Sequence, residues 1–247
     1  MTSPRRRRLR QTLAAAALVA GLATGASQAT VGAKGAFPGS EVFADQDGVG
    51  IVGGDAGSAI ETDIQPGDAI VITDSAGVSV ADDPFPEDGF GCTAIDSNRA
   101  RCDFPSDGGL RVSLGAGDDA LTADRAISGQ LAGTGGSGGD SVVLPIGSES
   151  FLQFRGNKGG DVIAGASERD VIRGGPGADL LRGRAGVDLV NGKKGRDQLL
   201  GGSGDDSLRA GHGDRDKRID CGTGRDHAKV DRRVDPRPVS CERVQRS

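Results

Sequence analysis

The chain has 247 residues, of which 43 are glycine and seven are phenylalanine, and it contains neither tyrosine nor tryptophan. This composition excludes a large globular core built on aromatic packing and favours a thin core of small aliphatic side chains. The formal net charge is −5 with both signs mixed along the chain. We therefore expect no basic face for nucleic acid or for an anionic membrane surface.

A basic start followed by a short apolar stretch predicts a secretory signal peptide over residues 1–29. Five arginines precede the apolar residues 13–25, and the small side chains of Ser27 and Ala29 favour cleavage after Ala29. The apolar stretch is too short to span a bilayer, and no later segment is long and apolar enough to do so. We therefore expect a secreted, extracellular protein, exported by either the general or the twin-arginine route.

Residues 30–113 are expected to form a β-rich N-terminal cap. Short strands are predicted at residues 49–52, 69–73 and 78–80, with glycine, proline and aspartate in the turns between them. Residues 82–91, rich in proline, aspartate and glycine, are expected to form an exposed loop. Such a cap would cover the open end of a repetitive fold, whose unpaired strand edge otherwise invites aggregation.

Residues 156–209 consist of six nine-residue units that follow one another without a gap. Each unit begins with glycine, and glycine recurs at the fourth place in every unit except the one that has Glu168 there. Each has aspartate at the sixth place and an aliphatic residue at the eighth. A fixed short period of this kind predicts a solenoid, whereas a disordered Gly-Asp linker would not keep six aliphatic residues in phase.

The three kinds of residue in the unit have three different physical roles. Glycine permits positive φ and close chain approach, so it marks the turn. The aliphatic residue lies in the only stretch that can form a strand, and its side chain points into a narrow core. Stacked turns would place the aspartates one above another, where like charges repel. Carboxylate and carbonyl oxygens suit a hard cation between them, above all calcium.

The units resemble the RTX, or hemolysin-type, calcium-binding nonapeptide repeat G-G-x-G-x-D-x-U-x, where U is a large aliphatic residue, and residues 174–182 and 201–209 match it best. The resemblance implies an all-β, right-handed parallel β-roll in which two units make one coil and Ca²⁺ lies between turns one coil apart. It implies that Asp161, Asp179 and Asp197 line one edge and that Asp170, Asp188 and Asp206 line the other. The metal ligands it implies are these six aspartates, Asp140, and the backbone carbonyls of turn glycines, namely Gly174, Gly177, Gly183, Gly186, Gly192, Gly195, Gly201 and Gly204.

Degenerate copies extend the predicted array to residues 114–229. Residues 135–143 match fully, residues 114–122 keep Asp119, and residues 221–229 keep Asp226. Residues 144–152 keep Gly147 and place Phe151 at the eighth position, but they have Glu149 in place of aspartate. Residues 230–247 are expected to form a solvated C-terminal cap.

The basic residues of the array argue against uniformly tight calcium binding. Between residues 156 and 209 nine Lys and Arg face seven Asp and one Glu, a net charge of about +1 (nine minus eight). Six of the nine fall on turns, where they would repel calcium or replace it by pairing with the aspartates: Lys158, Arg169, Arg184, Lys193, Lys194 and Arg196. Because affinity follows ligand charge, we expect some sites to be weak or empty, the strongest pair being Asp188 with Asp206 or Asp161 with Asp179.

Four cysteines are consistent with export to an oxidising compartment. None has the spacing of metal ligands, and pairing of neighbours, Cys92–Cys102 and Cys221–Cys241, is the simplest of the three possible connectivities.

Two classes of function fit these features. The first is a non-catalytic calcium-binding β-roll with a surface, matrix or adhesion role, folded by calcium outside the cell. The second is a secreted hydrolase or toxin in which the repeats only assist folding. Its one candidate nucleophile, Ser137, lies in a G-x-S-x-G match, but that motif needs a following helix and a histidine base, and the chain has only His212 and His227. We therefore favour the first class and expect no enzyme activity, no nucleic-acid partner and calcium ions as the ligand.

Overall fold

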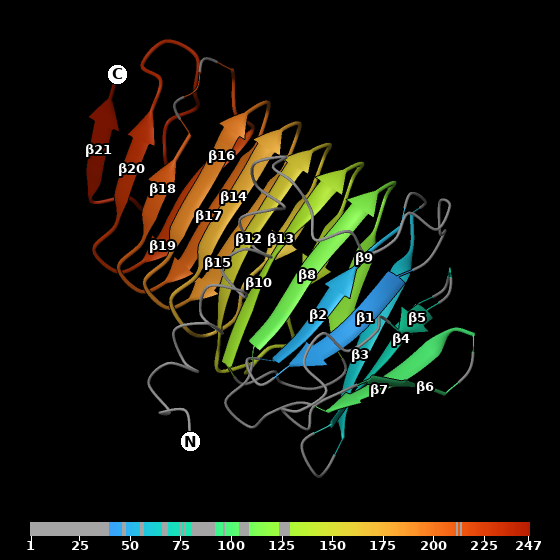
Figure 1. The fold of residues 1–247 in the computed structure, drawn as a ribbon. Helices are drawn as coiled ribbons and strands as arrows, with labels where there is room; N and C mark the ends of the chain where they lie inside the picture. Colours follow the sequence, from blue (N-terminus) through green and yellow to red (C-terminus); the bar gives the residue numbers. More distant parts are fainter. Residues whose placement is uncertain are drawn as a thin grey trace, which may run out of the picture. The chain divides into compact units, whose positions relative to one another are not determined.

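Two long β-sheets face each other in the computed structural model, and in the repeats the chain alternates between them from one strand to the next (Figure 1). The structure describes residues 40–45, 48–54, 57–65, 69–74, 76, 78–80, 92–95, 97–103, 109–123, 129–210, 212 and 214–247. Within these residues the secondary structure is all β, with no helix. The expected signal peptide (residues 1–29) and loop (residues 82–91) lie outside the described residues.

The first sheet, sheet A, has eleven strands in the order β21-β20-β18-β16-β14-β12-β10-β8-β2-β1-β5. In chain order these strands are β1 (Ser40–Asp45), β2 (Gly48–Val52), β5 (Val78–Val80), β8 (Gly109–Ala116), β10 (Gly129–Ser137), β12 (Ser150–Lys158), β14 (Val171–Pro176), β16 (Leu189–Lys194), β18 (Ser207–Arg209), β20 (His227–Val230) and β21 (Arg243–Arg246). From β2–β8 to β20–β21 every pairing is parallel.

The second sheet, sheet B, has ten strands in the order β19-β17-β15-β13-β11-β9-β3-β4-β7-β6. They are β3 (Ala59–Gln65), β4 (Ala69–Asp74), β6 (Cys92–Ala94), β7 (Arg99–Asp103), β9 (Ala120–Ala123), β11 (Ser141–Val143), β13 (Val162–Ala164), β15 (Leu180–Ala185), β17 (Gln198–Ser203) and β19 (Arg218–Thr223). Parallel pairing runs from β3 to β19. The predicted all-β parallel β-roll is confirmed.

One aliphatic side chain per repeat fills the space between the sheets. The residues at the eighth place are fully buried and alternate between sheet B and sheet A: Ile163, Ile172, Leu181, Val190, Leu199 and Leu208. Because parallel pairing keeps successive coils in register, as with Leu181 opposite both Ile163 and Leu199, each core side chain lies on the one from the coil before. Burial of these stacked side chains is the main hydrophobic stabilisation of the roll.

One predicted repeat has the wrong register. Strand β12 pairs with β14 so that Phe154, and not Phe151, lies opposite the core residue Ile172. Phe154 is fully buried, whereas Phe151 is only half-buried. The connection before β12 is therefore three residues longer than a nonapeptide turn, and Glu149 does not occupy the aspartate place. The large aromatic ring decides the register, because it fits the core and the turn has room for the extra residues.

The strands from β1 to β7 extend both sheets beyond the repeats. The predicted strands over residues 49–52, 69–73 and 78–80 are present as β2, β4 and β5, and β1, β3, β6 and β7 are additional. Pairing here becomes antiparallel in β1–β2, β3–β4, β4–β7 and β6–β7. Sheet B thus ends in antiparallel strands, and sheet A ends in the β1–β2 hairpin with β5 added parallel to β1.

Disulfides hold both ends of the structure. Cys92–Cys102 joins β6 to β7, and Cys221–Cys241 joins β19 to the segment that leads into β21. The predicted pairing of neighbours is confirmed, and the protein has no free cysteine.

Candidate functional site

The turns between the sheets place the aspartates along two edges of the roll. We call the edge where the chain passes from sheet A to sheet B the first edge, and the return from sheet B to sheet A the second edge. The predicted ligands Asp140, Asp161, Asp179 and Asp197 lie on the first edge, and Asp170, Asp188 and Asp206 on the second. All seven are at most 2% exposed, which is unusual for carboxylates.

Hydrogen bonds join the aspartates of each edge into a ladder. On the first edge, the amide of Asp161 donates to Oδ1 of Asp179 at 2.9 Å, and the amide of Asp179 donates to Oδ1 of Asp197 at 3.0 Å. On the second edge the amide of Asp170 donates to Asp188 at 2.7 Å and that of Asp188 to Asp206 at 2.9 Å. Each carboxylate thus gains one backbone donor from the coil before it, which offsets part of the cost of its burial.

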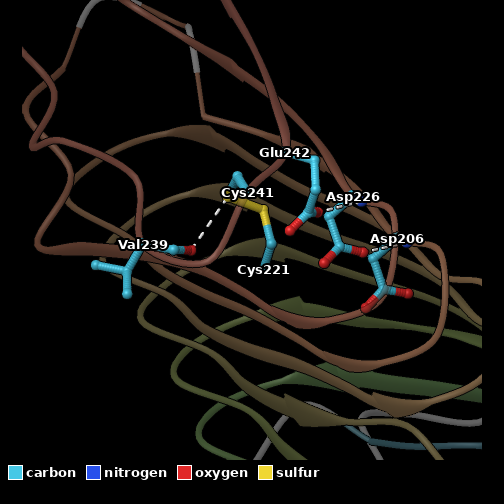
Figure 2. Close-up of a disulfide and its surroundings, with 6 residues drawn as sticks. All are labelled: Asp206, Cys221, Asp226, Val239, Cys241 and Glu242. Atoms are coloured by element: carbon cyan, nitrogen blue, oxygen red, sulfur yellow. Dashed lines mark hydrogen bonds between the residues drawn. A yellow bond between two sulfur atoms is a disulfide. The ribbon is translucent and has the colours of Figure 1, made fainter.

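The ladders continue beyond the regular repeats. On the first edge the series runs from Asp119 to Asp235 and includes Asp216, whose Oδ1 accepts the amide of Asp197 at 2.9 Å. On the second edge the amide of Asp206 donates to Asp226, and the amide of Asp226 donates to Glu242, each at 2.7 Å. Figure 2 shows Asp206, Asp226 and Glu242 in a row beside the Cys221–Cys241 disulfide.

Sequence reasoning missed Asp216, Asp235 and Glu242. Asp216 follows Asp197 by 19 residues and Asp226 follows Asp206 by 20, instead of the 18 of two perfect units. The inserted residues break the nine-residue phase but leave one aspartate per turn. A search for one acidic residue every 18 to 20 positions would have found Asp216 and Asp235, whereas no such spacing predicts Glu242, 16 residues after Asp226.

The second carboxylate oxygen, Oδ2, has no hydrogen-bond partner in most aspartates of the two ladders. This holds for nine buried aspartates of the described chain: Asp119, Asp140, Asp161, Asp179, Asp188, Asp197, Asp206, Asp216 and Asp226. Buried acceptors without a partner are rare and costly. A row of them therefore indicates that a cation belongs beside each oxygen.

The first glycine of each repeat makes room for that oxygen. A methyl group on Gly174 would collide with Oδ2 of Asp179 and lie 2.8 Å from the carbonyl oxygen of Gly192, one coil further on. A methyl group on Gly183 would meet Asp188 in the same way and lie 2.7 Å from the Gly201 carbonyl oxygen. A carboxylate oxygen and a backbone carbonyl oxygen of the next coil therefore approach the same point.

The glycines at the fourth place of the repeats allow successive coils to pack closely. Gly177, Gly186, Gly195 and Gly204 all have positive φ, and a methyl group on any of them would collide with a backbone carbonyl of the preceding coil. The structure shows this close packing, and the amide of Gly195 donates to Oδ2 of Asp214 at 3.0 Å. The role of these four glycines as carbonyl ligands stays a prediction.

Burial raises the pKa of every ladder aspartate for which a shift is resolved. The pKa is raised to about 7 for Asp140, Asp179, Asp188 and Asp216, and to about 6 for Asp170 and Asp206. Desolvation is the largest cause of the raised pKa. The hydrogen bond from a backbone amide of the preceding coil lowers the pKa, and for most of these groups the neighbouring carboxylates of the ladder raise it further. In the absence of a cation, the carboxyl groups with a pKa of about 7 are therefore partly protonated at neutral pH, and cation binding releases those protons.

Of the six turn cations, only Arg184 is half-buried. Lys158, Arg169, Lys193, Lys194 and Arg196 are exposed. The Nη1 atom of Arg184 donates to the carbonyl oxygens of Leu144 at 2.6 Å and Gly165 at 2.8 Å. The expected pairing of these cations with aspartates thus takes another form, because Arg184 binds backbone carbonyls.

The donor set fits calcium. In the described part of the chain, no three His, Cys, Asp or Glu side chains come together, so carboxylates alone cannot form a site. Carboxylate Oδ2 atoms and first-place carbonyls are hard oxygen donors, which Ca²⁺ prefers and softer metals do not. Asp161 with Asp179 and Asp188 with Asp206, the pairs expected to be strongest, both present two Oδ2 atoms without partners.

Comparison with protein families supports the same conclusion. Residues 155–190 and 191–214 match the family model of the RTX calcium-binding nonapeptide repeat, in four copies. These residues are RTX repeats. The match confirms the resemblance and, with the β-roll, supports calcium binding by these repeats. Comparison with curated proteins and with solved structures gives no match.

Proposed function

We propose that this protein is a secreted, non-catalytic β-roll that folds on calcium and acts as a surface, matrix or adhesion component. The observation that carries the proposal is the row of buried Oδ2 atoms without hydrogen-bond partners. Those of Asp140, Asp179, Asp188 and Asp206 lie next to a repeat-opening glycine and near a carbonyl of the next coil. Binding of calcium there releases protons and removes the desolvation penalty, so that binding energy becomes folding energy.

Two features support a location outside the cell. Both disulfides close small loops that persist in an oxidising compartment, and calcium is plentiful there. The described part of the chain has no helix that could serve as a membrane span. The arginine-rich start and the apolar stretch after it favour export through a cleaved signal peptide.

The surroundings of Ser137 support a role without catalysis. Ser137 is exposed at the end of β10, in a run of strands rather than at a strand–helix turn. His227 lies on β20, and four strands of sheet A separate β20 from β10. At about 4.8 Å per strand this histidine is roughly 24 Å away and cannot act as a base for the serine.

Calorimetric calcium titration of the chain that begins at Thr30 tests the proposal, together with circular dichroism in calcium and in EDTA. We expect binding at millimolar calcium or below, and loss of β-structure in EDTA. Asp188→Asn keeps the acceptor for the Asp170 amide but removes the charge, and it should reduce the number of bound ions. Asp205→Asn is the matched control, because Asp205 is exposed and pairs with Arg225 at 3.0 Å.

Two results would contradict the proposal. Absence of binding at millimolar calcium would remove the metal role. Hydrolysis of protease or lipase substrates that disappears in Ser137→Ala would replace it with the alternative, a hydrolase or toxin assisted by RTX repeats.

A further inference from the structure

One turn of the second edge differs from the others in its chemistry. Strand register places Leu152 opposite Asp170, and the amide of Leu152 donates to Oδ1 of Asp170 at 2.8 Å. Leu152 therefore occupies the place that an aspartate holds on the later rungs, and its buried side chain offers no oxygen. Asp170 differs too, because its Oδ2 accepts the amide of Ala166 at 2.8 Å.

Arg184 reaches this turn from the coil that follows. It is the second residue of the repeat 183–191, with φ 83°, and its half-buried guanidinium extends back along the second edge. The two carbonyls that it binds, those of Leu144 and Gly165, occupy equivalent places in two successive turns. The residues directly before them, Val143 and Ala164, are paired across the sheet. In later coils the corresponding carbonyl, that of Gly201, lies beside a carboxylate Oδ2 without a partner.

Equivalent turns of the second edge are thus stabilised in two different ways. Later coils offer two carboxylates and a carbonyl, a set that needs an added cation. The coil before Asp170 offers carbonyls and one carboxylate whose oxygens already have donors, and a positive group of the chain lies among them. Charge-assisted hydrogen bonds from a guanidinium to two carbonyls are strong and already formed without any ion.

We propose that the guanidinium of Arg184 is a built-in substitute for one calcium ion, so that the second-edge turns of the two coils formed by residues 141–176 hold together without metal. The proposal rests on the proposed function for the other coils, where calcium performs this task. Chelation should therefore unfold the roll unevenly, with the coil bound by Arg184 among the last parts to open.

Arg184→Gly tests the proposal by hydrogen exchange and mass spectrometry. Glycine suits the positive φ and already occupies the second place of two repeats, at Gly175 and Gly202, so the backbone is not strained. In EDTA we expect the protection of residues 141–176 to fall about tenfold or more, as loss of two charge-assisted hydrogen bonds implies. In saturating calcium we expect protection to return, because an ion can take the vacated place among the carbonyls.

Lys193→Gly is the matched control. Lys193 also occupies the second place of its repeat, with φ 74°, but on the first edge and with an exposed side chain. It should leave protection unchanged in both conditions. Unchanged protection of Arg184→Gly in EDTA overturns the proposal, and so does a loss that calcium does not restore, since that would indicate a packing role.

Failure of this proposal is distinguishable from failure of the proposed function. The calcium titration of the unmodified chain decides the latter, whereas the comparison of variants in EDTA decides the former. If Arg184→Gly does not fold in calcium, Arg184→Gln replaces it, because glutamine keeps much of the side-chain volume and removes the charge. The same loss in EDTA and recovery in calcium are then required.

Discussion

At the scale of single residues, glycine sets how closely the coils stack. Gly195 has φ 132°, and the hydrogen that takes the place of its side chain faces the carbonyl oxygen of Gly177 one coil earlier. No other amino acid fits there without moving one coil away from the next. Gly147 also has positive φ, 86°, but no atom lies within 4 Å of the place a side chain would take.

These two glycines separate the effect of φ from the effect of contact. We expect Gly147→Ala to lower the free energy of unfolding by about 1–2 kcal/mol through backbone strain alone. Gly195→Ala adds overpacking and should cost about 2–5 kcal/mol in total. Urea unfolding in calcium measures both values. Equal losses would show that close coil contact contributes little.

At the scale of elements, the C-terminal strand depends on a covalent link. All four residues of β21 are exposed, and among the strands of the described residues β21 pairs with β20 alone. The disulfide Cys221–Cys241 fixes the residue just before Glu242, whose carboxylate accepts the amide of Asp226 at 2.7 Å. The last acidic group of the second edge is therefore placed by a bond to the core of β19.

Removal of this disulfide should loosen one end of the roll only. For Cys221→Ala with Cys241→Ala we expect a loss of about 2–4 kcal/mol in the free energy of unfolding. Hydrogen exchange should accelerate in Arg243–Arg246 and leave β14 and β15 unchanged. Cys92→Ala with Cys102→Ala serves as the control and should loosen β6 and β7 instead. A uniform loss of protection in both variants would argue against local anchoring.

At the scale of the whole molecule, the raised pKa values add up to a pH dependence that metal reverses. A carboxyl whose folded-state pKa is raised binds its proton more tightly in the folded protein than in the unfolded chain. The stability it supports is therefore fully present below its ordinary pKa near 3.8 and is lost as pH rises through about 6–7. Summed over both ladders, the metal-free roll should be least stable above neutral pH.

Thermal unfolding between pH 4 and pH 8 measures this dependence. In EDTA we expect Tm to fall as pH rises, whereas in saturating calcium the fall should be absent, because calcium replaces the protons. Calcium affinity should rise over the same range. A Tm in EDTA that increases from pH 5 to pH 8 would show that the aspartates are ionised and solvated without metal.

The nine-residue repeat predicts the structure of those parts of the molecule that keep its period. Period and residue type were enough for the parallel roll, for the two edges and for the buried residues at the eighth place, since each unit sees the same surroundings. Where the nine-residue period is interrupted, local packing and inserted residues set the structure instead. Phe154 overrides the apparent repeat of residues 144–152, and insertions hide Asp216 from a search with a nine-residue step.

The position of Arg184 was not predictable in detail. Its place on a turn indicated a cation near the ligands, but its hydrogen bonds go to Leu144 and Gly165, 40 and 19 residues earlier. Such contacts depend on the three-dimensional stacking of unlike turns. The strands β1, β3, β6 and β7 were missed for a related reason, because their sequences carry no repeat, although Arg99–Asp103 of β7 alternates polar and small apolar side chains.

The amide-to-carboxylate bonds all point the same way, so a stack of these coils has two unlike ends, as a polar filament does. One end presents carboxylates that seek donors, and the chain closes it with the amide of Ser58, which donates to Asp119 at 2.7 Å. The other end presents amides that seek acceptors, and Asp235 and Glu242 supply them. Both ends of the ladder are thus closed by residues of the same chain, so extension of the ladder onto a second molecule would first have to break these bonds.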